Sequence, residues 1–430
     1  MNQLNFEQYY QFDYQNKNQI KEEQLKLLHQ QITYTISNSP FYKKKWKDFP
    51  INSPTWYEAF KKMPLTRKED IQNQNDDFIA VSNALIRDIT STSGSEGAPI
   101  YIYQTQRDIE RLALNEALSF SKLALDSHPR IQLMLTLDKL FMAGMAYYQG
   151  GLSQQGQLIR SGPGQTYKQI ELLKKFQPDV VVAVPSFLLY ILQSEDVSSY
   201  FQEKPLKVLA IGENLRSGNG EALPLLKQLE ALDFVEVYST YASTEMQTAF
   251  TECAEKNGNH QQSALIFMEC LDEFGNDADE GELVITHLGI EGFPLLRYAT
   301  GDMISTDKSE CPCGRNTPRI KSVLYRKNQR LKIKGTTLYP ADIDPIFQQF
   351  NLQQSYYIEI FKNDFGLDDL KIFVDSAIFD ESLLKKVRER LQHSLKLRPN
   401  LIIQDTLEFH RRLFKDESRK PLKIQDLRNI

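Results

Sequence analysis

Apolar and polar positions alternate along the middle of the chain with two different periods. Four short apolar runs have the length and composition of buried strands. They are residues 132–137, 179–184, 207–212 and 234–240. Between them, amphipathic segments at 166–176 and 220–232 are typical of helices. Strands and helices that alternate at this spacing predict right-handed crossovers and a mostly parallel sheet.

The two ends of the chain follow other patterns. Residues 1–80 are polar and helical in pattern, with many Gln, Asn and Lys. The last part combines strand-like runs with one long amphipathic helix, which predicts a small α+β unit. These segments are 356–361, 370–375, 381–395 and 401–404. Because 430 residues exceed the usual size of one core, we expect two or more domains. The change of pattern near residue 330 divides the chain into residues 1–327 and 328–430.

Composition narrows the class of protein. Hydrophobic residues make up 41% and charged residues 25% of the chain, as in globular proteins. The net charge of −5 gives no electrostatic reason to expect a nucleic acid or an anionic membrane as partner. The first residues lack the basic and apolar pattern of a secretory signal, and the longest apolar run, 180–192, is too short for a membrane span. We therefore expect a cytoplasmic enzyme.

Several polar turns stand where a small-molecule site would lie. Pro185-Ser186, Gly212-Glu213 and residues 240–245 each follow an apolar strand, and ligands of open α/β sheets bind beyond the carboxyl ends of strands. Residues 90–97 crowd hydroxyls and glycines between two strand-like segments. Such a stretch is either an ordinary hairpin loop or a loop whose N–H and O–H groups hold phosphate.

Six motifs together carry a resemblance to a known family. They are "SGSEG" (93–97), "YASTE" (241–245), "RYATGD" (297–302), "CPCGRNTPRI" (311–320), "LKIKGTTLYPADID" (331–344) and "RKPLKIQDLR" (419–428). In this order and spacing the chain resembles the phenylacetate–CoA ligases of the adenylate-forming superfamily, from residue 39 to the C-terminus. The resemblance implies a large N-terminal α/β domain and a small α+β C-terminal domain that swings between two reaction steps.

The resemblance also implies a reaction. A carboxylate attacks the α-phosphorus of ATP, pyrophosphate leaves, and the thiol of CoA then attacks the acyl-adenylate and releases AMP. Catalysis of the first step is mostly positioning and cationic stabilisation. By resemblance, Thr244 binds the α-phosphate, Glu245 holds Mg²⁺, and Lys420 bridges the acid and the phosphates.

The nucleotide is assigned in the same way. Tyr241 would stack on adenine, and Asp302, helped by Arg326, would accept hydrogen bonds from the ribose hydroxyls. The remaining nucleotide-binding positions form the phosphate loop and the border of the adenine site. They are Ser93, Gly94, Ser95, Gly97, Gly212, Glu213, Ala242 and Ser243.

Some positions depart from the family pattern. Glu96 and Ala98 replace a threonine and a lysine of the phosphate loop, so a carboxylate would face the triphosphate and a cation is lost. The hinge falls on Asn328, where an acidic residue is typical. The segment that lines the acid pocket contributes Asp138, Phe141 and Gly144. Asp138 stands near a usual aromatic, which favours an acid other than phenylacetate.

Four further residues have the chemistry of a metal site. Cys253, His260, Cys311 and Cys313 offer three thiolates and one imidazole, the ligand set of a closed structural Zn²⁺ site. Related ligases carry a similar arrangement. The alternative is a set of unrelated thiols with an exposed histidine. Cys270 lies in an apolar run and is expected in the core.

Three functions are therefore weighed. The first is an ATP-dependent acid–thiol ligase with ATP/AMP, Mg²⁺, structural Zn²⁺ and coenzyme A as its cofactors and co-substrate. The second transfers the acyl group to a carrier-protein thiol. The third is a non-catalytic protein that binds a nucleotide or an acyl-adenylate, which Glu96 and Ala98 favour. A homodimer is considered beside a monomer, because the sequence leaves the oligomeric state open.

Overall fold

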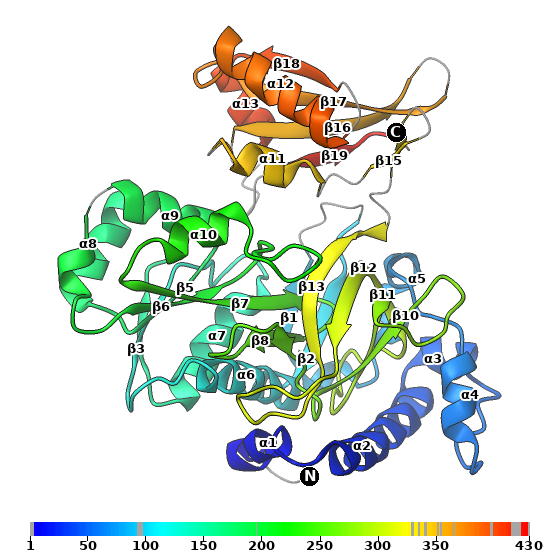
Figure 1. Cartoon of the computed structure of the whole chain (residues 1–430). Coiled ribbons are helices and arrows are strands. Elements are labelled where there is room, and N and C mark those ends of the chain that lie inside the picture. Colours follow the sequence, from blue (N-terminus) through cyan, green and yellow to red (C-terminus); the bar gives the residue numbers. More distant parts are fainter. Residues whose placement is uncertain are drawn as a thin grey trace. The chain divides into compact units, whose positions relative to one another are not determined.

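The computed structural model places most of the chain. It describes residues 4–92, 98–194, 196–327, 331–333, 336–338, 342–350, 352, 355–363, 366–395, 399–413 and 423–428. These form two compact units, Met1–Ala222 with Leu226–Val323, and Leu324–Ile430 with Leu223–Leu225 (Figure 1). The predicted domain boundary at 327/328 stays a prediction. Six predicted site residues lie outside the described residues, namely Ser93, Gly94, Ser95, Gly97, Asn328 and Lys420.

Helices form the N-terminal part of the first unit, as its polar pattern predicts. They are α1 (Phe6–Phe12), α2 (Lys17–Asn38), α3 (Pro40–Lys45), α4 (Trp56–Lys62) and α5 (Lys68–Asn73), followed by η1 (Asn75–Phe78) and η2 (Asn83–Leu85). Asn16 and Gln19 form a capping box that starts α2. Ile20, Leu28 and Ile32 recur at helical spacing along α2 and are buried, so one face of the helix packs on the domain.

The middle of the chain forms the predicted strand–helix alternation. Its elements are β3 (Arg130–Leu133), α7 (Met142–Ser153), β4 (Gln157–Arg160), α8 (Thr166–Phe176), β5 (Val180–Ala183), α9 (Pro185–Ser194), η3 (Ser198–Tyr200), β6 (Leu206–Ala210), α10 (Pro224–Glu230) and β7 (Val235–Ser243). The strands pair in parallel in the order β4-β3-β5-β6-β7. Helices cover both faces, with α8 and α9 on one side and α7 on the other (Figure 1). Every residue of β5 is therefore buried, which explains its continuous apolar run.

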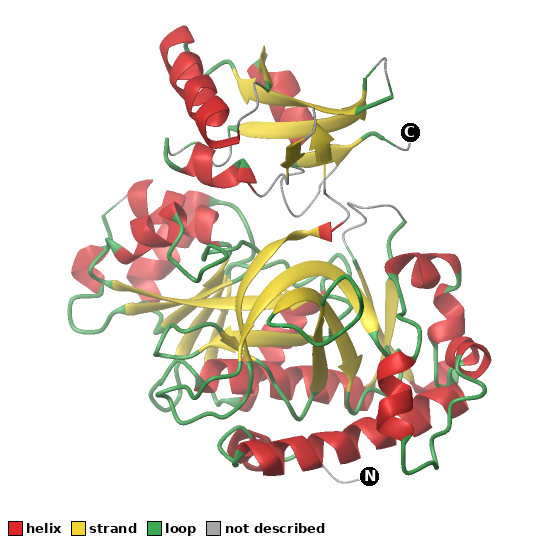
Figure 2. Ribbon diagram, turned by 45° about the vertical axis from the view of Figure 1, so that its right-hand side comes forward, coloured by secondary structure: helices red, strands yellow, loops and turns green. Residues whose placement is uncertain are grey.

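The remaining strands of the same sheet run antiparallel. They are β8 (Thr248–Glu252), β9 (Asn259–His260), β10 (Ile266–Leu271), β11 (Glu280–His287), β12 (Tyr298–Asp307) and β13 (Arg319–Arg326). The complete sheet has 11 strands in the order β10-β11-β12-β13-β9-β8-β7-β6-β5-β3-β4 and is strongly curved (Figure 2). A separate hairpin pairs β1 (Ile86–Ser91) with β2 (Tyr101–Thr105), and α6 (Gln106–Ser121) follows it. The α/β prediction is confirmed, and the parallel ladders of this sheet run from β4 through β3, β5 and β6 to β7.

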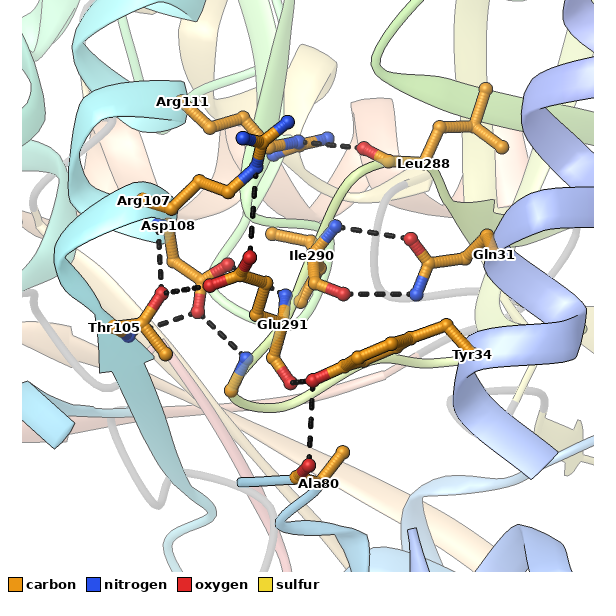
Figure 3. A network of polar contacts seen from close by, with 11 residues as sticks. Gln31, Tyr34, Ala80, Thr105, Arg107, Asp108, Arg111, Leu288, Ile290 and Glu291 are labelled. Atoms are coloured by element: carbon orange, nitrogen blue, oxygen red, sulfur yellow. Dashed lines mark hydrogen bonds and ion pairs between the residues drawn. The ribbon is translucent and has the colours of Figure 1, made fainter. Parts of the chain in front are cut away.

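A polar network fastens α2 and α6 to the connection after β11 (Figure 3). Gln31 of α2 donates to the carbonyl of Ile290 at 2.9 Å and accepts from its N–H at 3.1 Å. Tyr34 donates to the carbonyl of Glu291 at 3.0 Å. Asp108 of α6 accepts from the N–H groups of Glu291 and Gly292, each at 2.8 Å. These bonds satisfy backbone groups of a largely buried loop.

The second unit is the predicted α+β arrangement. Its elements are β14 (Leu331–Ile333), β15 (Thr336–Leu338), α11 (Asp344–Gln348), β16 (Tyr356–Lys362), β17 (Asp368–Asp375), α12 (Glu381–Leu395), β18 (Asn400–Gln404), α13 (Thr406–Leu413) and β19 (Ile424–Asp426). Four of the strands form a sheet in the order β18-β17-β16-β19. Val387, Leu391 and Leu395 of α12 are buried, which is the face that the sequence pattern predicts.

No helix among the described residues has the length and apolarity needed to cross a membrane.

Candidate active site

The loops after the parallel strands meet at one edge of the sheet. Gly212 follows β6 with a φ of 80°, a left-handed conformation that favours glycine, and it directs the chain into Glu213. The Glu213 carboxylate accepts hydrogen bonds from the Ser186 N–H at 2.9 Å and the Ser186 hydroxyl at 2.8 Å. Glu213 therefore caps the first turn of α9, where a negative charge is favoured. Its predicted contact with a nucleotide stays a prediction.

Two of the sequence motifs come together through one hydrogen bond. The Tyr241 hydroxyl, near the end of β7, donates to the Asp302 carboxylate of β12 at 2.7 Å. Asp302 is buried. The two strands are not adjacent in the sheet order, so this bond joins distant parts of the curved sheet. A tyrosine ring beside a buried carboxylate suits a nucleoside, with a stacking surface for a base and an acceptor for ribose hydroxyls.

A bulge in β12 sets the direction of Asp302. The pairing with β11 shifts register between Glu282 and Val284, opposite residues 300–302. Gly301 adopts a φ of 77° there. The Thr300 hydroxyl donates to the Leu283 carbonyl at 2.9 Å and accepts from the Asp302 N–H at 3.1 Å. The "ATGD" sequence thus encodes the local turn that orients the carboxylate.

The turn after β7 presents a hydroxyl and a carboxylate. The Ser243 hydroxyl accepts from the Met246 N–H at 3.3 Å and holds the turn, while Ala242 is exposed on β7. Glu245 is buried at 8% exposure. Within the described part of the chain, neither its carboxylate nor the Thr244 hydroxyl makes a hydrogen bond or ion pair. A carboxylate on a mostly buried side chain, with no partner among the described residues, is suited to a cation.

Sequence reasoning missed two buried residues that contact this turn. His287 of β11 lies 2.9 Å from the Glu245 carbonyl oxygen, and Arg111 of α6 donates to the Gln247 carbonyl at 2.7 Å. Burial lowers the pKa of His287 to about 3. The signal in the sequence was a lone histidine at the end of an apolar run, which does not reveal its distant partner.

The predicted acid-pocket residues lie before and within α7. Asp138 is exposed, Phe141 precedes the helix and is half-buried, and Gly144 is buried in its first turns. A Cβ on Gly144 would stand 1.9 Å from the Thr136 carbonyl oxygen, so no larger residue fits without movement. The helix can therefore pack tightly on the loop that precedes it. The role of these residues as an acid pocket stays a prediction.

The same loop is attached to the hairpin. The Ser91 N–H, at the end of β1, donates to the Leu140 carbonyl at 2.9 Å. Lys139 and Leu140 both adopt left-handed backbone angles, with φ of 55° and 57°. Such angles are costly for residues with side chains and persist where other contacts fix them. The predicted acid-pocket segment is thus joined to the strand that leads into residues 93–97.

The four predicted metal ligands converge. Their ligand atoms all lie within 4.8 Å of one another, and the cluster consists of Cys253, His260, Cys311 and Cys313. The sulfurs of Cys253 and Cys311 are 3.7 Å apart, and the Cys313 sulfur lies 3.5 Å from His260 Nε2. A tetrahedral zinc ion separates its sulfur and nitrogen ligands by roughly 3.5 to 3.8 Å. The alternative of unrelated thiols with an exposed histidine does not fit, because His260 is buried.

The surroundings of the cluster suit a thiolate site. The other ring nitrogen of His260 lies 3.1 Å from the Thr317 hydroxyl, which fixes the orientation of the ring. Hydrogen bonds from Cys253 and His260 hold the pKa of Cys313 well below its usual range. Asp13, at the end of α1, accepts from the Asn316 N–H through its carbonyl at 2.8 Å. The cluster loop therefore also anchors the first helix. Cys270 is buried in β10, as expected for a core residue.

Arg326 is the last residue of β13 and is exposed. It belongs to the second compact unit, and its predicted contact with ribose stays a prediction.

Comparison with known proteins supports the resemblance carried by the motifs. No family model matches the chain. It is 24% identical to the phenylacetate-coenzyme A ligase of Thermus thermophilus, over 95% of this chain and 96% of that protein. It is 25% identical to the phenylacetate-coenzyme A ligase of Escherichia coli, over 93% of each chain.

Solved structures share the fold. A 2-hydroxyisobutyryl-CoA ligase in the postadenylation state, in complex with R3-HIB-AMP, superposes with a TM-score of 0.76 at 18% identity, covering 97% of this chain and 91% of its own. The o-succinylbenzoate coenzyme A synthetase of Bacillus subtilis, in complex with ATP and a magnesium ion, gives a TM-score of 0.57 at 16% identity, covering 78% and 68%. The predicted resemblance and the predicted fold are confirmed.

Proposed function

We propose that this chain, a relative of the phenylacetate–CoA ligases with the fold of the adenylate-forming CoA ligases, joins a carboxylic acid to the thiol of coenzyme A with the use of ATP. In the first step a carboxylate oxygen of the acid bonds to the α-phosphorus and pyrophosphate leaves. In the second the thiolate sulfur bonds to the acyl carbon and AMP leaves. The observation that carries the proposal is the hydrogen bond from Tyr241 to Asp302, which joins two motifs far apart in the sequence.

Each residue then has a separate task. The ring of Tyr241 offers a face for adenine, and Asp302 accepts hydrogen bonds from the ribose hydroxyls. The Thr244 hydroxyl binds an α-phosphate oxygen. Glu245 fits a magnesium ligand, because its side chain is mostly buried and its carboxylate oxygens have no partner among the described residues. The ion supplies positive charge that stabilises the phosphates, and Lys420 is proposed to supply more.

We further propose that the preferred acid differs from phenylacetate. Asp138 places an exposed carboxylate in the loop before α7, where it favours an acid with a polar or cationic group. Glu96 in the phosphate loop adds a second negative charge. The chain is thus expected to be a slower adenylating enzyme than a standard phenylacetate–CoA ligase, or one with another acid.

ATP–pyrophosphate exchange over a panel of aryl, fatty and amino acids, with and without CoA, tests the function. Exchange with one acid, and its acyl-CoA when CoA is present, is the expected result. The matched control is Glu245→Gln, which keeps the shape and removes the charge. It should lose the exchange, whereas a contaminating enzyme would leave it unchanged. Exchange without acyl-CoA would favour a carrier-protein thiol as acceptor.

A second candidate, a non-catalytic nucleotide-binding protein, rests on Glu96 and Ala98. ATP or AMP binding without exchange for any acid would favour it over the ligase. A cytoplasmic location stays a prediction. A homodimer also stays a prediction, and light scattering coupled to size-exclusion chromatography tests it.

We also propose that the cysteine–histidine cluster holds a structural Zn²⁺. The ligand spacing and the buried, oriented His260 support this. Metal analysis of the purified protein should find close to one equivalent of zinc, and less than about half an equivalent would contradict a structural site. Cys313→Ser should lose the metal. Cys270→Ala, a buried cysteine outside the cluster, should retain it.

A further inference from the structure

His287 has a fixed tautomer that follows from its neighbours. Its Nδ1 lies 3.0 Å from the Leu295 N–H and its Nε2 lies 2.9 Å from the Glu245 carbonyl oxygen. A backbone N–H can only donate, so Nδ1 accepts and the proton sits on Nε2. His287 therefore donates to the Glu245 carbonyl. The ring is fully buried and its pKa is lowered to about 3 by that burial, so it stays neutral near pH 7.

Other buried contacts hold the same turn at Gln247, two residues after Glu245. Arg111 donates to the Gln247 carbonyl at 2.7 Å and to the Thr248 hydroxyl at 2.9 Å. It also donates to the Leu288 carbonyl at 2.9 Å, next to His287 in the chain (Figure 3). Gln247 has a φ of 46°, a left-handed angle that is costly for a residue with a side chain. Contacts from α6 and β11 therefore impose the backbone path of the turn.

The side chain of Glu245 has no such restraint. Its carboxylate makes no hydrogen bond or ion pair with any residue that the structure describes. Its direction then depends on the Cα–Cβ bond, which the orientation of the adjacent peptide groups determines. The hydrogen bond from His287 fixes the peptide group that contains the Glu245 carbonyl.

We propose that His287 is a positioning residue that orients the peptide of Glu245 and so aims its carboxylate at the magnesium ion of MgATP. This inference rests on the proposed function, in which Glu245 binds that ion. His287 touches neither the ion nor the nucleotide in this scheme and acts only through Glu245.

Two substitutions separate this role from simple packing. In His287→Gln the terminal amide nitrogen reaches the place of Nε2 and still donates to the Glu245 carbonyl, while the Leu295 N–H loses its acceptor. In His287→Asn the terminal oxygen reaches the place of Nδ1 and still accepts from Leu295, while the Glu245 carbonyl loses its donor. Each variant loses one buried hydrogen bond, so both should lose similar thermal stability.

The measurement is ATP binding by titration calorimetry at stepped Mg²⁺ concentrations, beside thermal unfolding of each variant. We expect His287→Asn to need about tenfold more Mg²⁺ for half-maximal ATP affinity, and His287→Gln to stay within about threefold of the unmodified chain. Equal Mg²⁺ requirements, or a requirement that follows the loss of thermal stability, would overturn the inference. If the unmodified chain binds ATP without any effect of Mg²⁺, the proposed role of Glu245 fails first.

A second measurement needs no variant to fold. With ¹⁵N-labelled histidine, the resonances of His287 should show the Nε2–H tautomer and stay neutral on mild acidification. They should shift when MgATP is added and shift less with ATP plus a chelator. Identical spectra under both conditions would contradict a link between His287 and the metal site.

Discussion

The hydroxyl of Tyr241 offers the sharpest single perturbation of the proposed nucleotide site. Tyr241→Phe keeps the ring and removes the group that donates to Asp302 at 2.7 Å. Asp302 is only 5% exposed, so water replaces the lost donor poorly. A hydrogen bond to a charged group contributes about 1.5 to 3 kcal/mol, and we expect the free energy of unfolding to fall by that amount.

A double-mutant cycle with Asp302→Ala isolates this bond. Urea unfolding of the two single variants and the double variant should give a coupling energy of about 1.5 to 3 kcal/mol, because the second change removes a bond already lost. Tyr238→Phe is a matched control, since its hydroxyl donates to Glu236 instead. The losses of unfolding free energy caused by Tyr238→Phe and by Asp302→Ala should be additive, with a coupling energy below about 0.5 kcal/mol. The same small value for Tyr241→Phe would refute the reasoning.

The cycle also has a kinetic counterpart. Loss of the bond removes one restraint on the Asp302 carboxylate, the proposed acceptor for the ribose hydroxyls. Because the ribose is bound in the ground state and the transition state alike, KM for ATP should rise more than kcat falls. A fall in kcat with an unchanged KM would contradict that assignment.

Three further changes test other parts of the structure. Gly144→Ala places a methyl group 1.9 Å from the Thr136 carbonyl oxygen, so α7 must shift, and KM for the acid should change more than KM for ATP. Burial raises the pKa of Glu116 from 4.5 to about 7, so its contribution to stability is present below pH 4.5 and is lost as pH rises through about 7. The difference in unfolding free energy between the unmodified chain and Glu116→Gln should therefore decline over that window, and a flat difference would count against it. Lys420→Ala should lose pyrophosphate exchange by orders of magnitude while nucleotide still binds, and intact exchange would exclude its proposed role.

Local periodicity was enough to predict many elements of the fold. The predicted helices at 166–176 and 381–395 coincide with α8 and α12, and the apolar run at 179–184 contains β5. The hydrophobic periodicity of each of these segments is complete within a few helical turns or strand residues, so the local sequence is sufficient to predict it. The antiparallel strands β8–β13 were not predicted in detail, because their pairing depends on partners far away in the sequence. Register across such distances leaves no periodic signal in one chain.

The residues of the candidate site also fall into those that the local sequence predicts and those that it does not. Three cysteines and a histidine, at 253, 260, 311 and 313, predict a metal site from their ligand chemistry alone. In the structure their ligand atoms converge, in agreement with that prediction. Tyr241 and Asp302 were predicted from motifs, while the bond between them depends on the curvature of the sheet. His287 and Arg111 were missed because the role of each depends on the backbone carbonyl groups that it contacts, and these groups are distant in the sequence.

The bond between Ser91 and Leu140 bears on how the acid preference could be redesigned. It uses only main-chain atoms, an N–H of β1 and a carbonyl of the loop before α7. Exchange of the exposed Asp138 side chain therefore leaves this attachment in place. A library randomised at position 138 changes the charge and size of the loop while the tie to the hairpin persists. Under the proposed acid-pocket role, position 138 is therefore where selection for new acids should begin.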